Sequence, residues 1–163
     1  MKERSIDIAL TQSEAGKGLE TIYENVCTLA TEHDLCFNYA TTDDLKNWGF
    51  LEGCFSTFLM GKKDIIIQVI TTYRNQEGAS SAYKADADYL KKHHYGKKIE
   101  NKQIGDASIM LMKKQNDGTT YNLLFLKDNV FAAVSAKYEI EKEGNIDYIT
   151  GFAEKIEVKL SQN

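Results

Sequence analysis

The adjacent histidines His93 and His94 are the first residues of this chain whose type could support chemistry. Imidazole binds transition metals and transfers protons near neutral pH. Asp86 and Asp88 lie one to two helical turns upstream and could add a carboxylate to either ring. Neighbouring residues on a helix point about 100° apart, however, so one helix cannot easily direct both rings at a single metal. We therefore expect a solvated helix end here, with a metal site as the alternative.

The three cysteines, Cys27, Cys36 and Cys54, form neither a CxxC motif nor a zinc-type spacing. We expect buried free thiols that behave as small apolar side chains. The alternative is a single disulfide, either Cys27–Cys36 or Cys36–Cys54. A catalytic thiolate would need an adjacent imidazole, and His33 is a candidate for that role. Cys27 and Cys54 lie in apolar patterns, which favours a core position over catalysis.

No other catalytic or cofactor motif is present in the sequence. Residues 16–18 lack the spacer and the Lys-Ser/Thr ending of a phosphate-binding loop. A carboxylate pair occurs at 43–44, but acid–base catalysis needs a carboxyl with a shifted pKa in a cleft, and sequence spacing cannot show one. No serine lies in a nucleophile-elbow pattern. The sequence therefore predicts no catalytic residue, no metal and no cofactor. The alternative is a small enzyme with a dispersed site that involves His33, His93 or His94.

Aromatic residues indicate a different kind of site, a groove that binds a ligand. They gather in two stretches, residues 39–58 and 73–95. We expect most of them in the core, but ligand sites are commonly lined by aromatic side chains. Trp48 follows two aspartates in a loop-like segment, while Tyr83 and Tyr89 belong to a predicted helix. These three are the predicted ligand-binding residues.

The charge of the chain limits the class of partner that it can bind. The formal net charge of −4 opposes binding to nucleic acid, which depends on clustered Lys and Arg. The one basic cluster, residues 91–98, could hold an anionic partner, but cations are also typical of a helix C-terminus, where they complement the dipole. No run of about 18 apolar residues is present, so no transmembrane segment is predicted.

The 163 residues fit one domain, 1–163. Apolar residues at helical spacing predict a long first helix at 13–33. Its apolar stripe consists of Leu19, Ile22, Tyr23, Val26, Leu29 and Ala30. Residues 5–10 fit either a short strand or a short helix. A strand is expected at 35–39, followed by a turn or a short capped helix at 42–44.

The middle of the chain predicts two paired strands and a helix. The strands are expected at 49–60 and 65–70, joined by a hairpin-like connection at 61–64. The second strand is apolar on both faces, as in a sheet that is covered on both sides. The helix is expected at 79–94, with Gly96 as its C-terminal stop.

Four short strands separated by Gly, Asn and Asp follow, which is typical of an antiparallel meander. They are expected at 98–104, 107–114, 119–127 and 130–138. A last helix, capped by Asn145, is expected to run to Leu160. The prediction is an α+β fold with an antiparallel sheet of about six to seven strands, covered by two to three amphipathic helices.

An alanine-rich helix with the sequence Ala79-Ser80-Ser81-Ala82-Tyr83 precedes the turn Ile104-Gly105-Asp106-Ala107. A meander through residues 123–131 and a last amphipathic helix follow. Over residues 65–160 this arrangement resembles a loose group of uncharacterised, often secreted or lipid-anchored prokaryotic domains, some with folds of the Mog1/PsbP type. The resemblance implies an extracytoplasmic binding or accessory module whose Gly-Asp turn is structural, and it carries over no functional residue.

The chain departs from that group because it has three cysteines and because Met1-Lys2-Glu3-Arg4 does not begin a visible export signal. A leader that was removed and replaced by Met would leave the same sequence. The resemblance therefore still favours an extracytoplasmic location, with the cytoplasm as the alternative. The predicted function is a non-enzymatic binding or accessory module that uses a sheet face or a groove between sheet and helix, and its partner is a small molecule or a protein. A homodimer is the third possibility.

Overall fold

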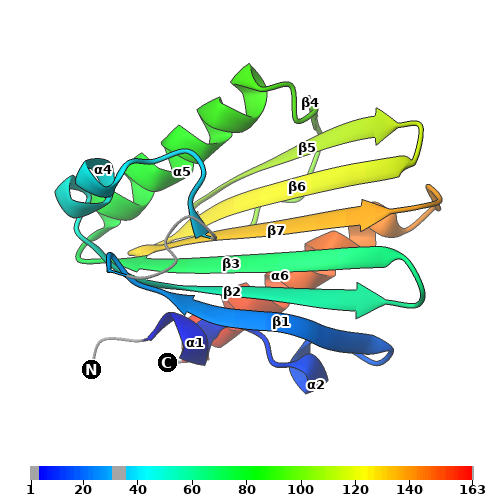
Figure 1. The fold of residues 1–163 in the computed structure, drawn as a ribbon, viewed down its shortest axis with the longest axis horizontal. Coiled ribbons are helices and arrows are strands. Elements are labelled where there is room, and N and C mark those ends of the chain that lie inside the picture. The colour runs from blue at the N-terminus through cyan, green and yellow to red at the C-terminus, as the bar shows by residue number, and fades with distance from the viewer. Residues whose placement is uncertain (1–3, 31–35, 163) are drawn as a thin grey trace.

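The computed structural model describes residues 4–30 and 36–162, and it contains one antiparallel sheet with helices on both faces (Figure 1). The strand order is β1-β2-β3-β7-β6-β5-β4, and every neighbouring pair is antiparallel. The predicted α+β class is confirmed. The elements are α1 (Ser5–Ile8), α2 (Gln12–Ala15), β1 (Leu19–Cys27), α4 (Thr42–Asn47), β2 (Phe50–Met60), β3 (Asp64–Tyr73), α5 (Gln76–Lys92), β4 (Lys97–Ile99), β5 (Ala107–Gln115), β6 (Gly118–Lys127), β7 (Val130–Tyr138) and α6 (Asn145–Gln162).

The predicted helix at 13–33 is wrong in the described residues, because its central part forms the edge strand β1. A bulge explains the misleading pattern. Thr21 pairs with Phe58 and Tyr23 pairs with Thr57, so Ile22 is an extra residue that interrupts the alternation of a strand. The apolar residues are then separated by three or four positions, which imitates a helix. The ambiguous segment at 5–10 contains the short helix α1.

The strand predicted at 35–39 is wrong in the described residues, because Cys36 is helical and residues 37–40 form neither helix nor strand. Leu35 lies outside the described residues. Cys36 and Phe37 are both buried although they are consecutive, which a strand with one covered face does not allow. The next segment forms the short helix α4, begun by a capping box between Thr41 and Asp44. The strands expected at 49–60 and 65–70 are confirmed as β2 and β3.

The meander of four strands is confirmed, but β4 is shorter than the predicted strand at 98–104. After Ile99 the chain leaves the sheet, and Ile104 is fully buried in the core. The helix predicted at 79–94 is confirmed as α5. Gly96 was expected to stop this helix, but the residue with a positive φ that directly follows its C-cap is His94 (φ 57°). Gly96 is needed for a different reason, since a Cβ there would lie 2.6 Å from the Met112 carbonyl oxygen.

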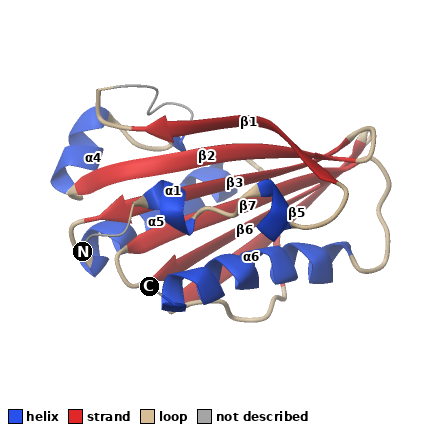
Figure 2. Ribbon diagram, turned by 90° about the horizontal axis from the view of Figure 1, so that it is seen from below, coloured by secondary structure: helices blue, strands red, loops and turns tan. Residues whose placement is uncertain are grey.

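Two apolar cores lie on opposite faces of the sheet. On one face, α6 and α1 pack against the strands, as Figure 2 shows. The predicted apolar face of the last helix is confirmed here, with Ile149, Phe152 and Ile156 buried. On the other face, α5 packs against β3, β6 and β7. No helix in the described residues is long and apolar enough to cross a membrane.

The expectation that all cysteines are free thiols is wrong, because Cys27 and Cys36 form a disulfide. This bond was the alternative prediction, and it joins the end of β1 to the irregular segment before α4. Cys54 is a free and fully buried thiol, as expected. Burial raises the pKa of its thiol to about 11, so Cys54 is protonated near neutral pH and is not a nucleophile.

Candidate functional site

A cavity of about 220 Å³ lies between α5, segment 36–40 and the sheet face that α5 covers. The segment contributes Cys36 and Tyr39 to its wall, and α5 contributes Asp86 and Leu90. Strands β2, β3, β6 and β7 form the floor. The volume is below the roughly 300–1,000 Å³ of a typical ligand pocket, so it suits a small ligand or one end of a larger one.

The disulfide fixes the segment that closes the cavity on one side. Cys36 is tied to Cys27 at the end of β1, and the next residue, Phe37, is buried among aromatic rings. The Phe37 ring lies 4.9 Å from that of Phe50 and 5.6 Å from that of Tyr39, both in edge-on geometry. These contacts hold the Tyr39 side chain against the cavity.

Helix α5 carries the opposite wall, and close contacts fix its position. The Asn75 side chain caps the helix by accepting a hydrogen bond from the Gly78 amide at 2.9 Å. A Cβ at Gly78 would lie 1.8 Å from the Trp48 carbonyl oxygen, so only glycine allows this approach of α5 to the end of α4. Small residues on the buried face, including Ala82, bring the helix close to the sheet and aim Asp86 into the cavity.

Polar groups with no partner are the most informative feature of the cavity. Asp86 is only 8% exposed, and no hydrogen bond or ion pair from the described residues reaches its carboxylate. Burial raises the pKa of this carboxyl to about 7. Asn122 is 5% exposed, and its Oδ1 accepts a hydrogen bond from the Ser135 hydroxyl at 2.7 Å. Its Nδ2 is buried and has no hydrogen-bond partner in the described part of the chain.

Two buried phenols lie near the carboxylate. The hydroxyl oxygens of Tyr39 and Tyr73 are buried, and neither forms a hydrogen bond of normal geometry with a described residue. Burial raises the pKa of both phenols, and the negative charge of Asp86 adds to the effect. Both hydroxyls are therefore neutral near pH 7, and Asp86 is the group at this place that can change its charge.

The predicted residues Trp48, Tyr83 and Tyr89 lie around the cavity but do not line it. Trp48 ends α4 and is half-buried against the core below α5. The Tyr83 ring contacts Phe131, a residue of the cavity floor, at 6.2 Å between centroids. The Tyr89 ring lies 4.1 Å from that of His93 at the end of the helix. Their role in binding a ligand stays a prediction.

The histidines are not brought together into a site. His93 Nδ1 lies 2.9 Å from the Tyr89 carbonyl oxygen, and both His93 and His94 are exposed at the end of α5. His33 lies outside the described residues. Within the ranges 4–30 and 36–162, no group of three or more His, Cys, Asp and Glu side chains is arranged to hold a metal ion.

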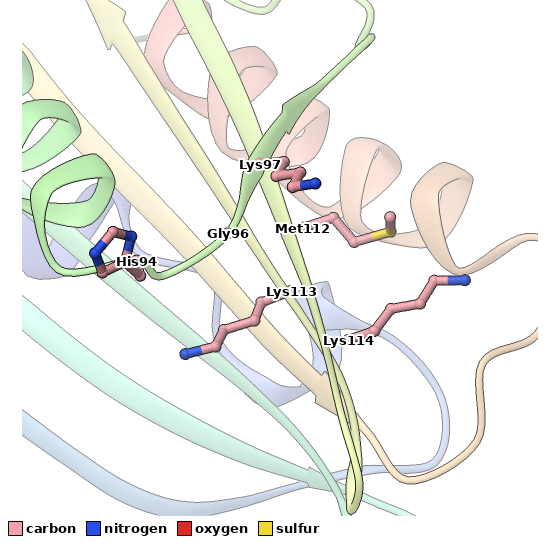
Figure 3. A pocket seen from close by; sticks show the side chains of 6 residues that line it. All are labelled: His94, Gly96, Lys97, Met112, Lys113 and Lys114. Carbon is pink, nitrogen blue, oxygen red and sulfur yellow. The ribbon is translucent and has the colours of Figure 1, made fainter.

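A second cavity, of about 460 Å³, lies at the edge of the sheet beside the basic cluster (Figure 3). Its side chains do not converge. Lys113 extends toward the side of His94, whereas Met112 and Lys114 extend to the opposite side of the strand. Lys114 also forms an ion pair with Glu141 at 2.7 Å. Lysines that point apart on an exposed strand edge provide no common site for an anion, so the smaller cavity is the better candidate.

Sequence reasoning missed the floor of the cavity, above all Asn122 and Ser135. Asn122 carried a signal, because it interrupts the apolar run of a strand that is buried on both faces. Asp86 carried a similar signal, because it lies among the alanines on the buried face of α5. The pairing of Asn122 with Ser135 depends on the register of β6 and β7, which the sequence does not specify.

Comparisons with known proteins identify the fold. No family model matches the chain. No curated protein matches it either. The extracellular domain of PknH from Mycobacterium tuberculosis matches with a TM-score of 0.66 at 13% identity, over 98% of this chain and 96% of that one. An uncharacterised protein from Mycobacterium smegmatis, the Rv0999 ortholog, matches with a TM-score of 0.41 at 9% identity, over 93% of this chain and 95% of that one.

At this identity, the first match shows a shared fold, and the second has too low a score to support an argument. The shared fold belongs to an extracellular bacterial domain, which agrees with the broader part of the resemblance found in the sequence. The finer likeness to the Mog1/PsbP type stays a prediction.

Proposed function

We propose that this chain is a non-enzymatic binding module that takes a small, mostly apolar ligand into the cavity between α5, segment 36–40 and the sheet. One observation carries the proposal: Asp86 and Asn122 Nδ2 are buried without partners in a cavity that is also lined by apolar side chains. Buried polar groups normally have partners, because leaving one unpaired costs about 1–3 kcal/mol. A ligand with complementary polar groups would satisfy them.

The chemistry of the wall favours binding over catalysis. General acid–base or nucleophilic catalysis needs at least two reactive groups in mutual reach. Among the described lining residues, Asp86 is the single carboxylate, and no histidine accompanies it. The alternative of a dispersed enzyme site built on His93 or His94 has no such support, since both are exposed at the end of α5.

We also infer that the module works outside the cytoplasm as a single α+β domain. The Cys27–Cys36 disulfide supports this location, because such bonds persist in oxidising compartments. The fold shared with an extracellular domain supports it as well. An accessory role of the Mog1/PsbP kind fits the same reading. A small-molecule ligand is favoured over nucleic acid by the net charge of −4, and a homodimer stays a prediction.

Binding of a small neutral probe tests the proposal. Benzyl alcohol, which combines an aromatic ring with a hydroxyl group, should produce saturable shifts of cavity amides such as Leu124 in 1H–15N spectra. In the variant Ala133→Phe, an added ring fills the floor and should abolish the shifts. Glu20→Phe is the control, because Glu20 is exposed on the edge strand β1 and lies outside the cavity. Non-saturable shifts, or shifts that persist in Ala133→Phe, would contradict the proposal.

A further inference from the structure

We infer that the ligand of this cavity is a cation: a protonated amine on a small apolar body, whose ammonium group binds the Asp86 carboxylate. The inference rests on the proposed function and adds the charge of the ligand to it. It follows from the distribution of charge in the wall, from the aromatic rings around the carboxylate and from the unpaired amide of Asn122.

The charge of the wall is negative. Asp86 is the only Asp, Glu, Lys, Arg or His side chain among the described residues that line the cavity. It is more than nine-tenths buried, and no described residue forms an ion pair or a hydrogen bond with it. A buried carboxylate of this kind is costly until a counter-charge reaches it. An ammonium group supplies both the charge and the donors, whereas an anionic ligand would add a second negative charge.

The aromatic rings favour the same class of ligand. Tyr39, Phe55, Tyr95 and Phe131 all contribute to the wall. The faces of such rings attract cations within about 6 Å of their centroids. One ring already has this role, since the Lys113 ammonium lies 5.9 Å from the centroid of the Tyr95 ring. The other three rings line the same cavity as Asp86 and would contact the apolar body of a ligand.

A second unpaired polar group, the side-chain amide of Asn122, indicates what the other end of the ligand carries. Asn122 Nδ2 is a buried donor without a partner in the described residues, and it lines the same cavity as Asp86. A donor of this kind pairs with an oxygen acceptor. No cationic side chain lines this cavity in the described residues, so a neutral carbonyl or hydroxyl oxygen fits better than a carboxylate.

The charge state of Asp86 sets the pH range of binding. The charge of Asp86 acts on the buried phenols of Tyr39 and Tyr73 by raising their pKa values, so both phenols stay neutral near pH 7. Burial raises the pKa of the Asp86 carboxyl to about 7. The carboxylate that attracts a cation therefore predominates at pH 8 and is largely protonated at pH 5. Affinity for an amine should rise over this range.

Three probes of nearly the same shape test the inference: benzylamine, benzyl alcohol and benzoate, each titrated at pH 8 and followed by 1H–15N spectra. A hydrogen bond to a charged group contributes about 1.5–3 kcal/mol, so benzylamine should bind at least about tenfold more tightly than benzyl alcohol. Benzoate should bind most weakly. At pH 5 the affinity for benzylamine should fall toward that for benzyl alcohol.

The variant Asp86→Asn keeps the shape of the side chain and removes its charge. It should remove the preference for benzylamine and the pH dependence, while binding of benzyl alcohol persists and shows that the cavity is intact. Equal affinity for the two probes in the unmodified protein would overturn the inference and leave the proposed function standing. Absence of binding by all three probes would instead refute the proposed function, and the inference with it.

Discussion

Replacing Asp86 by asparagine should stabilise the ligand-free protein, and by more at high pH than at low pH. The pKa of this carboxyl is raised by burial from its ordinary 3.8 to about 7 in the folded chain. Between these two values the folded state binds more protons than the unfolded state, so the free energy of unfolding falls as the pH rises. The loss begins near pH 4 and is complete above pH 7. An asparagine has no charge to desolvate and escapes this loss.

The magnitude follows from the size of the shift. A difference of about three pKa units corresponds to about 4 kcal/mol at pH values above 7. Part of that loss is already present at pH 5, so the gain from Asp86→Asn should grow by about 2.5 kcal/mol between pH 5 and pH 8. For a chain of this length, this corresponds to roughly 5–10 °C in melting temperature.

Thermal unfolding followed by circular dichroism at pH 5 and pH 8 measures this difference directly. Asp88→Asn is the matched control, because Asp88 lies two residues further along α5 and is exposed. It should change stability little, and equally at both pH values. If Asp86→Asn lowered the melting temperature at both pH values, the carboxylate would be making a stabilising contact, and the view of Asp86 as an unpaired group would be wrong.

Two further predictions concern the elements that hold the cavity walls. The Cys27–Cys36 disulfide closes a short loop, so reduction should lower the free energy of unfolding by about 2–3 kcal/mol, measured by urea unfolding with and without reductant. A Cys27→Ser, Cys36→Ser double variant should show no effect of reductant. Gly78→Ala should destabilise the protein by several kcal/mol, because the added Cβ would lie 1.8 Å from a backbone oxygen. Gly151→Ala, on α6, adds a Cβ in open space and should stabilise the protein by roughly 0.5–1 kcal/mol. Similar effects of the two glycine variants in urea would contradict the proposed close contact of α5 with the end of α4.

The strands after Gly96 could be predicted from the sequence because each signal there is local. Gly, Asn and Asp separate the apolar runs, and a short connection leaves few ways for neighbouring strands to pair. At the N-terminus the decisive features are not local. The bulge at Ile22 depends on the pairing of β1 with β2, and it converted the period of a strand into that of a helix. The irregular segment at 36–40 depends on a disulfide that sequence spacing left open.

The candidate site was only partly predictable for the same reason. The groove between sheet and helix was expected from the aromatic residues, and Asp86 was named as a carboxylate near the histidines. The choice of Trp48, Tyr83 and Tyr89, however, rested on residue type and not on position relative to a cavity. Which side chains meet there is decided by the register of four strands and by a disulfide-bonded segment that is distant in sequence.

The cost of Asp86 to the folded chain is itself an argument for binding. Alanines already occupy neighbouring positions on the buried face of α5, including Ala79, Ala82 and Ala87, so an alanine at position 86 would suit the helix without burying a charge. A residue that breaks the rules of folding without a compensating contact is typical of a functional position. The floor below it consists of paired antiparallel strands, which fix the positions of Asn122 and Ser135 relative to each other. Because the carboxylate and the floor are already in position, a ligand needs to order few side chains on binding. Its affinity then depends on the complementary charge that it brings.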